Sequence, residues 1–154
     1  MVFGGLPGTG RTTVARALAS RIAAVYLRID SIEQQVRANG RLGQDLGSVG
    51  YTVAYATARD NLSLGSTVVA DSVNPIGETR DSWLEVANQA GARVVEIELL
   101  RSDLQDHRRQ VESRTADIDG HQLPTWADVV ARAYQPWTRP HLIVDTSGRT
   151  VKRL

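Results

Sequence analysis

The chain has 154 residues, 42% of them hydrophobic and 23% charged, a composition that fits one globular domain and leaves little room for a second core. The net charge of +1 excludes a strong overall field for nucleic acid or membranes, and the lack of cysteine excludes disulfides and thiolate metal sites. No signal-peptide pattern precedes the first glycines and no apolar run could span a bilayer, so we expect a cytoplasmic monomer or homodimer.

Strands and helices are predicted to alternate along the chain. The strands are apolar and often β-branched, whereas the helices carry apolar residues three or four positions apart. The predicted strands cover residues 2–3, 25–29, 67–70, 92–100 and 141–144. The predicted helices cover residues 11–23, 31–38, 50–62, 76–89, the first two-thirds of 102–119, and 126–135.

Capping residues mark several of these helix boundaries. Ser31 with Gln34 resembles a capping box at the start of a helix. Gly91 occupies the usual position just after a helix end, and Thr125 is expected to cap the helix that follows it.

Five strands joined by helical crossovers predict an α/β fold with a mostly parallel sheet covered on both faces. Ligands of such sheets bind beyond the carboxyl ends of the strands. We therefore expect one site at that edge of the sheet. The residues that directly follow strands, and that this geometry brings together, are Gly5, Asp30, Asp71, Arg101 and Asp145.

Residues 5–12 (GLPGTGRT) have the spacing of a phosphate-binding loop, GxxxxG followed by a basic residue and threonine, between a strand and a helix. Glycines allow backbone N–H groups to turn toward phosphate oxygens, and the helix N-terminus adds positive potential. The hydroxyl of Thr12 is expected to bind Mg²⁺. The alternative is an ordinary glycine-rich turn.

Arg11 stands where such a loop usually carries lysine, and Lys152 is the only lysine in the chain. An ammonium group is a compact point charge, whereas a guanidinium group is longer, planar and forked. We expect triphosphate binding to survive in weakened form, because backbone amides carry much of it, and phosphoryl transfer to suffer more. The sequence leaves open a weakened enzyme, an adapted enzyme and a pseudoenzyme.

Six stretches resemble the small P-loop kinases, also described as predicted kinases or AAA-family ATPases. These are similar to gluconate kinase, chloramphenicol phosphotransferase, zeta toxin and polynucleotide 5′-kinase. The six stretches are GLPGTGRTT, RIDSIEQ, VVADSVNP with Arg80, HRRQVESRTADIDGHQLPTW, YQPW and LIVDTSG. The resemblance implies a three-layer P-loop NTPase fold with strand order 2-3-1-4-5, one domain over residues 1–154 and a helical lid over about 102–122. It implies ATP and Mg²⁺ as cofactors, with the nucleotide bound by Gly5, Leu6, Pro7, Gly8, Thr9, Gly10, Arg11, Thr12, Thr13 and Arg108.

The resemblance also assigns roles to two carboxylates. Asp30 would bind the acceptor and accept the proton of its hydroxyl, and the alternative is a helix N-cap. Asp71 ends the β-branched stretch VVAD, as a Walker-B carboxylate does. It would hold Mg²⁺ with Thr12, directly or through water, and the alternative is a plain turn residue.

Three further positions follow from the same resemblance. Asn74 and Arg80 match a D-x-x-N…R pattern that implies substrate contact or ordering of the site, whereas a solvated helix is the alternative for Arg80. Arg114 matches the lid arginine that stabilises the transferring phosphoryl group. Arg108 would reach the nucleotide or, alternatively, pair with Glu112 four residues on.

The leading hypothesis is an ATP-dependent phosphotransferase, a P-loop small-molecule kinase, that moves the γ-phosphoryl group to a hydroxyl of a small molecule. Its catalytic residues would be Asp30, Arg11 and Arg114. The acceptor would be a sugar acid, nucleoside, antibiotic or polynucleotide end, although no basic stripe supports nucleic acid. Because of Arg11, a nucleotide-binding pseudokinase or weak ATPase is the alternative.

Overall fold

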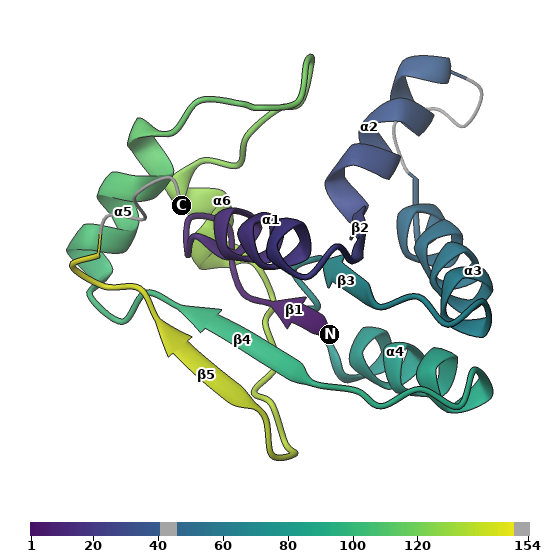
Figure 1. The fold of residues 1–154 in the computed structure, drawn as a ribbon. Coiled ribbons are helices and arrows are strands. Elements are labelled where there is room, and N and C mark those ends of the chain that lie inside the picture. The colour runs from purple at the N-terminus through teal and green to yellow at the C-terminus, as the bar shows by residue number, and fades with distance from the viewer. Residues whose placement is uncertain (41–45, 150–154) are drawn as a thin grey trace.

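A five-stranded parallel sheet forms the centre of the protein, with strand order β2-β3-β1-β4-β5 (Figure 1). The computed structural model describes residues 1–40 and 46–149, so Lys152 lies outside the described residues. Both the α/β class and the predicted strand order are confirmed. The strands are β1 (Val2–Gly4), β2 (Val25–Arg28), β3 (Val68–Asp71), β4 (Glu96–Leu100) and β5 (Leu142–Asp145).

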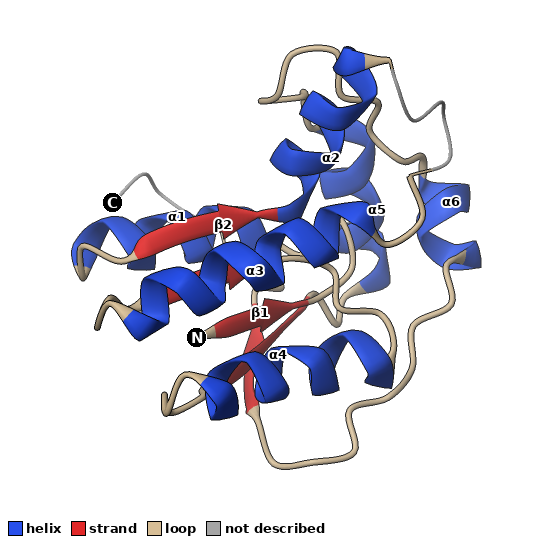
Figure 2. Ribbon diagram, turned by 90° about the vertical axis from the view of Figure 1, so that its right-hand side faces the viewer, coloured by secondary structure: helices blue, strands red, loops and turns tan. Residues whose placement is uncertain are grey.

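Helices cover both faces of the sheet, as Figure 2 shows from a second side. On one face, α1 buries alanines against Phe3 and Val69, and on the other α3 and α4 pack over Val2 and Ala70. Because side chains alternate along a strand, Asp71 shares the α1 face with Val69. The helices are α1 (Arg11–Arg21), α2 (Ile29–Asn39), α3 (Val49–Ser63), α4 (Gly77–Gln89), α5 (Leu104–Ser113) and α6 (Trp126–Ala131).

Several boundaries differ from the sequence-based expectation. β2 stops at Arg28 and α2 begins at Ile29, so Asp30 lies in the first helical turn. The N-cap of α2 is Arg28 with no side-chain cap, and the capping box predicted from Ser31 is therefore wrong. The expected strand at 92–100 forms only over its second half, as β4.

α6 is shorter than predicted because tertiary contacts hold the chain extended after it. The helix ends at Ala131 instead of continuing to 135. Beyond it, the amide of Gln135 donates to the carbonyl of Pro75 (2.7 Å). The predicted cap is confirmed, since the hydroxyl of Thr125 accepts from the Asp128 amide and the Asp128 carboxylate closes a capping box. No helix among the described residues is both long enough and apolar enough to cross a membrane.

Candidate functional site

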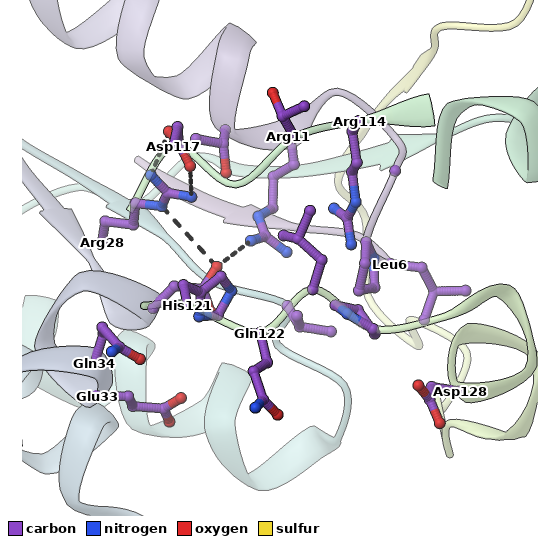
Figure 3. A pocket seen from close by; sticks show the side chains of 18 of the residues that line it. Leu6, Arg11, Arg28, Glu33, Gln34, Arg114, Asp117, His121, Gln122 and Asp128 are labelled. Atoms are coloured by element: carbon purple, nitrogen blue, oxygen red, sulfur yellow. Dashed lines mark hydrogen bonds and ion pairs between the residues drawn. The ribbon is translucent and has the colours of Figure 1, made fainter. Parts of the chain in front are cut away.

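A cavity of about 920 Å³ lies beyond the carboxyl ends of β1, β2 and β3. Its walls come from the glycine loop, the start of α1, the end of β2, α2, the segment 114–124 and α6 (Figure 3). Among the residues predicted for the site, those that line this cavity are Leu6, Pro7, Gly8, Gly10, Arg11, Thr12, Thr13, Asp30 and Arg114.

The glycine loop has the backbone conformation that its sequence requires. Gly5, Gly8 and Gly10 all have positive φ, at 137°, 84° and 83°, which side chains with a Cβ rarely adopt. A Cβ at Gly5 would clash with the carbonyl oxygen of Leu99. Gly10 is the N-cap of α1, so the first N–H groups of this helix have no helical acceptor and remain available to an anion.

The back of the loop is fixed by contacts from distant segments. A ring nitrogen of His107, on α5, lies 2.8 Å from the carbonyl oxygen of Pro7, and a Cβ at Gly8 would clash with Val111 of the same helix. The hydroxyl of Thr146 donates to the carbonyl of Thr9 (2.8 Å). These contacts hold the loop rigidly, which prepares its amides for a ligand.

Arg11 turns into the protein and is 6% exposed. Its Nε donates to Oδ1 of Asp71 (2.5 Å), its Nη1 donates to the carbonyl of Gly5 (2.8 Å), and its Nη2 lies 3.7 Å from Oδ2 of Asp30. Burial opposes the charge, but the two carboxylates outweigh it and raise the pKa of Arg11. The guanidinium group therefore bridges acceptors of the site itself.

Asp71 is fully buried, and both of its carboxylate oxygens accept hydrogen bonds. Arg11 occupies Oδ1, and the hydroxyl of Tyr26 donates to Oδ2 (2.6 Å). Burial raises the pKa of Tyr26 and the charge of Asp71 raises it further, so the phenol stays a neutral donor. This arrangement does not fit a Mg²⁺ ion bound directly to Asp71, although the half-buried Thr12 lines the cavity nearby.

Asp30 lies in the first turn of α2 with its side chain 30% exposed toward the cavity. Its Oδ2 is 3.7 Å from Nη2 of Arg11 and 4.0 Å from Nε of Arg28. It does not cap α2, because the N-cap is Arg28. The carboxylate is thus held between two cations and is reachable by a bound molecule, as a general base must be.

Arg114 follows α5 and its side chain lies beside that of Arg11 (Figure 3). Its Nε and Nη2 are buried and have no hydrogen-bond partner among the described residues. Burial is the main cause that lowers the pKa of Arg114, and the charges of Arg11 and Arg28 lower it further. An anion in the cavity would satisfy these two donors.

We expect Arg114→Ala to weaken binding of a nucleoside triphosphate about tenfold to hundredfold, the effect of losing a charged hydrogen bond. Isothermal titration calorimetry measures this directly. Arg108→Ala is the matched control, because the Arg108 side chain is 60% exposed, bonds Glu112 at 2.8 Å and does not line the cavity. Equal losses in the two variants would contradict a direct role of Arg114.

A bidentate ion pair closes one side of the cavity (Figure 3). Nη1 and Nη2 of Arg28 donate to the two carboxylate oxygens of Asp117, at 2.7 and 2.9 Å, and Arg16 of α1 adds a bond of 3.2 Å. Asp117 belongs to the segment 114–124, most of which lies within the lid predicted over about 102–122. The pair therefore ties this segment to β2 and α1.

At low pH the segment 114–124 should detach from β2. The hydrogen bond from Arg28 holds the pKa of Asp117 below its ordinary value of 3.8. The pair thus contributes above pH 3.8 and is lost as the pH falls through the lowered pKa. Hydrogen-exchange protection of the amides of 114–124 should fall with it.

At neutral pH, Asp117→Asn should reproduce the loss of protection, because an amide cannot form the ion pair. Glu112→Gln, which removes an exposed partner outside the cavity, is the control and should leave the segment protected. Unchanged exchange in Asp117→Asn would show that the pair does not close the cavity.

Asn74 and Arg80 do not line the cavity, and their polar atoms are bound inside the protein. Asn74, at a φ of 49°, donates from Nδ2 to the carbonyl of Phe3 (2.7 Å) and accepts from Nε1 of Trp83 (3.1 Å). Arg80 is 3% exposed, so the alternative of a solvated helix position is wrong. Substrate contact by either residue stays a prediction, and this geometry favours a structural role.

Among the residues at the site that sequence reasoning missed are Tyr26, Arg28 and Asp117. Tyr26 and Arg28 are two positions apart on β2 and therefore share a face, which is a weak signal for a polar edge. Asp117 lies in the stretch HRRQVESRTADIDGHQLPTW, but the resemblance assigned it no contact. Their partners lie 45 and 89 residues away in the sequence, where no local pattern reveals them.

The parallel sheet and the glycine loop that precedes a helix define a P-loop protein. Residues 1–136 match the family model AAA_33, described as an AAA domain, and the chain belongs to this family. No curated protein shows significant similarity to the sequence.

Solved structures share the fold at low sequence identity. A candidate kinase from Chloroflexus aurantiacus is 23% identical with a TM-score of 0.72, over 96% of this chain and 84% of that one. Kti12 of Chaetomium thermophilum, in complex with ADP-AlF3, is 21% identical with a TM-score of 0.70, over 94% and 87%. A gluconokinase from Sinorhizobium meliloti is 19% identical with a TM-score of 0.62, over 94% and 80%.

Proposed function

We propose that the chain is an ATP-dependent phosphotransferase that moves the γ-phosphoryl group to a hydroxyl of a small molecule. The observation that carries this proposal is Arg114, which lines the same cavity as the glycine loop and has two nitrogens without a hydrogen-bond partner among the described residues. Both kinds of donor bind phosphate oxygens. A similar fold carries AMPPNP and APS in the APS kinase of Mycobacterium tuberculosis, which supports a nucleotide and an acceptor here.

In the proposed reaction, the acceptor hydroxyl oxygen bonds to the γ-phosphorus while the bond to the β–γ bridging oxygen breaks and ADP leaves. Asp30 accepts the hydroxyl proton. Arg114 stabilises the negative charge of the transferred group. No step is assigned to Mg²⁺, since both oxygens of Asp71 already accept hydrogen bonds from Arg11 and Tyr26.

One observation favours a second function, nucleotide binding without transfer. The guanidinium group of Arg11 binds Asp71 and the carbonyl of Gly5, whereas a transferring enzyme needs positive charge on the phosphoryl group. In that case the chain would bind ATP and form no phosphorylated product.

Formation of ADP tests the two functions. The whole chain and Arg11→Lys would be incubated with ATP and, in turn, sugar acids, nucleosides, aminoglycoside-type alcohols and 5′-hydroxyl oligonucleotides. ADP that depends on one acceptor class supports the transferase. If both forms bind ATP and neither forms ADP with any acceptor, the second function holds and the transferase is wrong.

A further inference from the structure

Arg11 lies where the chemistry of a P-loop site calls for a metal ion. It contacts Asp71, the carboxylate at the end of β3, and Nη2 of the same guanidinium group lies 3.7 Å from Oδ2 of Asp30. A divalent ion in a site of this kind is held by such a strand-end carboxylate, directly or through water. In this chain a side-chain cation already occupies that position.

The charge of Asp71 is balanced without any metal ion. The carboxylate is 0% exposed, so it needs a counter-charge, and the buried guanidinium group of Arg11 supplies it at 2.5 Å. The remaining oxygen is taken by the hydroxyl of Tyr26. A divalent ion at Asp71 would have to compete with these two donors for the carboxylate oxygens. It would also be repelled by the positive charge of Arg11.

Arginine suits this position in a way that lysine does not. The three nitrogens of its planar fork reach Asp71, the Gly5 carbonyl and the neighbourhood of Asp30 in three different directions. A lysine ends in one compact ammonium group and cannot span the same three acceptors. Arg11→Lys should therefore leave at least one oxygen of the cluster open to a metal ion.

On the basis of the proposed function, we propose that Arg11 replaces the divalent metal ion as the counter-charge of Asp71, so that this chain binds nucleoside triphosphate independently of Mg²⁺. Arg11 is then a positioning residue that fixes Asp71 and the start of the loop. The phosphates are held by the loop amides and Arg114.

The test measures the Kd of AMPPNP for the whole chain by calorimetry, once with Mg²⁺ and once with EDTA. We expect the two values to agree within about threefold, which is less than the tenfold change that 1.4 kcal/mol produces. Binding that tightens about tenfold or more with Mg²⁺ would overturn the inference, because Arg11 would then have left Asp71 for the metal ion.

Two variants separate the contribution of Arg11 from that of its neighbour. In Arg11→Lys, Mg²⁺ should tighten binding by about tenfold or more. Tyr26→Phe frees one oxygen of Asp71, but the guanidinium group of Arg11 stays on the other oxygen, on the Gly5 carbonyl and near Asp30, so nucleotide binding should remain independent of Mg²⁺. If nucleotide binding depends on Mg²⁺ in Tyr26→Phe but not in Arg11→Lys, then Tyr26 and not Arg11 keeps the metal ion from Asp71, which contradicts the inference.

The outcomes for the inference and for the proposed function can be told apart. Binding that requires Mg²⁺, with ADP formed, overturns only the inference. Equal binding with and without Mg²⁺, with no ADP formed from ATP, supports the inference and rejects the transferase. A folded chain that binds no nucleotide under either condition rejects both.

Discussion

Arg80→Leu should lower the free energy of unfolding by about 3–5 kcal/mol, because a buried charged donor loses three hydrogen bonds at once. The nitrogens of Arg80 donate to the carbonyls of Asn74 (2.9 Å), Pro136 (3.0 Å) and Gln135 (2.6 Å). The guanidinium carbon also lies 4.4 Å from the ring centre of Trp137. Arg80 thus joins the loop after β3 to the segment before β5, and leucine leaves three carbonyls without their donor.

Urea unfolding of the purified variants measures the effect. Arg59→Leu is the matched control, since Arg59 is exposed on α3, and its change should stay within about 0.5 kcal/mol. Arg80→Lys keeps the positive charge but not the forked guanidinium group, so its loss in free energy of unfolding should lie between those of the two leucine variants. If Arg80→Leu unfolds at the same urea concentration as Arg59→Leu, the three hydrogen bonds do not stabilise the fold.

Asp30→Asn should lower kcat by about 10²–10⁴-fold, since an amide of the same shape cannot accept the proton of the acceptor hydroxyl. Nucleotide binding should change little, because in the proposed site the loop amides and Arg114, and not this carboxylate, donate to the phosphates. Acceptor-dependent ADP release and calorimetric Kd values, measured on the same preparation, separate the two effects.

Glu33→Gln is the control for Asp30→Asn. Glu33 lies one turn further along α2 and lines the same cavity. Burial raises the pKa of Glu33, and the charge of Asp30 raises it further. If Glu33→Gln removes turnover while Asp30→Asn retains it, the base is Glu33 and the assignment of Asp30 is wrong.

Local patterns identified the glycine loop and the architecture around it. The glycines at 5, 8 and 10 sit where the chain needs positive φ, and the loop stands between a buried strand and an alanine-rich helix. These signals act over a few residues, so the sequence carries them directly. Helical crossovers between the strands then require a parallel sheet with its ligand site at the carboxyl edge.

Tertiary structure decided which residues face that site. The sequence showed that Arg11 replaces lysine, but only the fold brings it to Asp71, 60 residues away, and directs it inward. The same holds for Arg80, which the fold surrounds with carbonyls, and for the pair of Arg28 and Asp117. Conformational preferences are local and can therefore be predicted from the sequence. The partner of a charged side chain depends instead on which distant segments pack together.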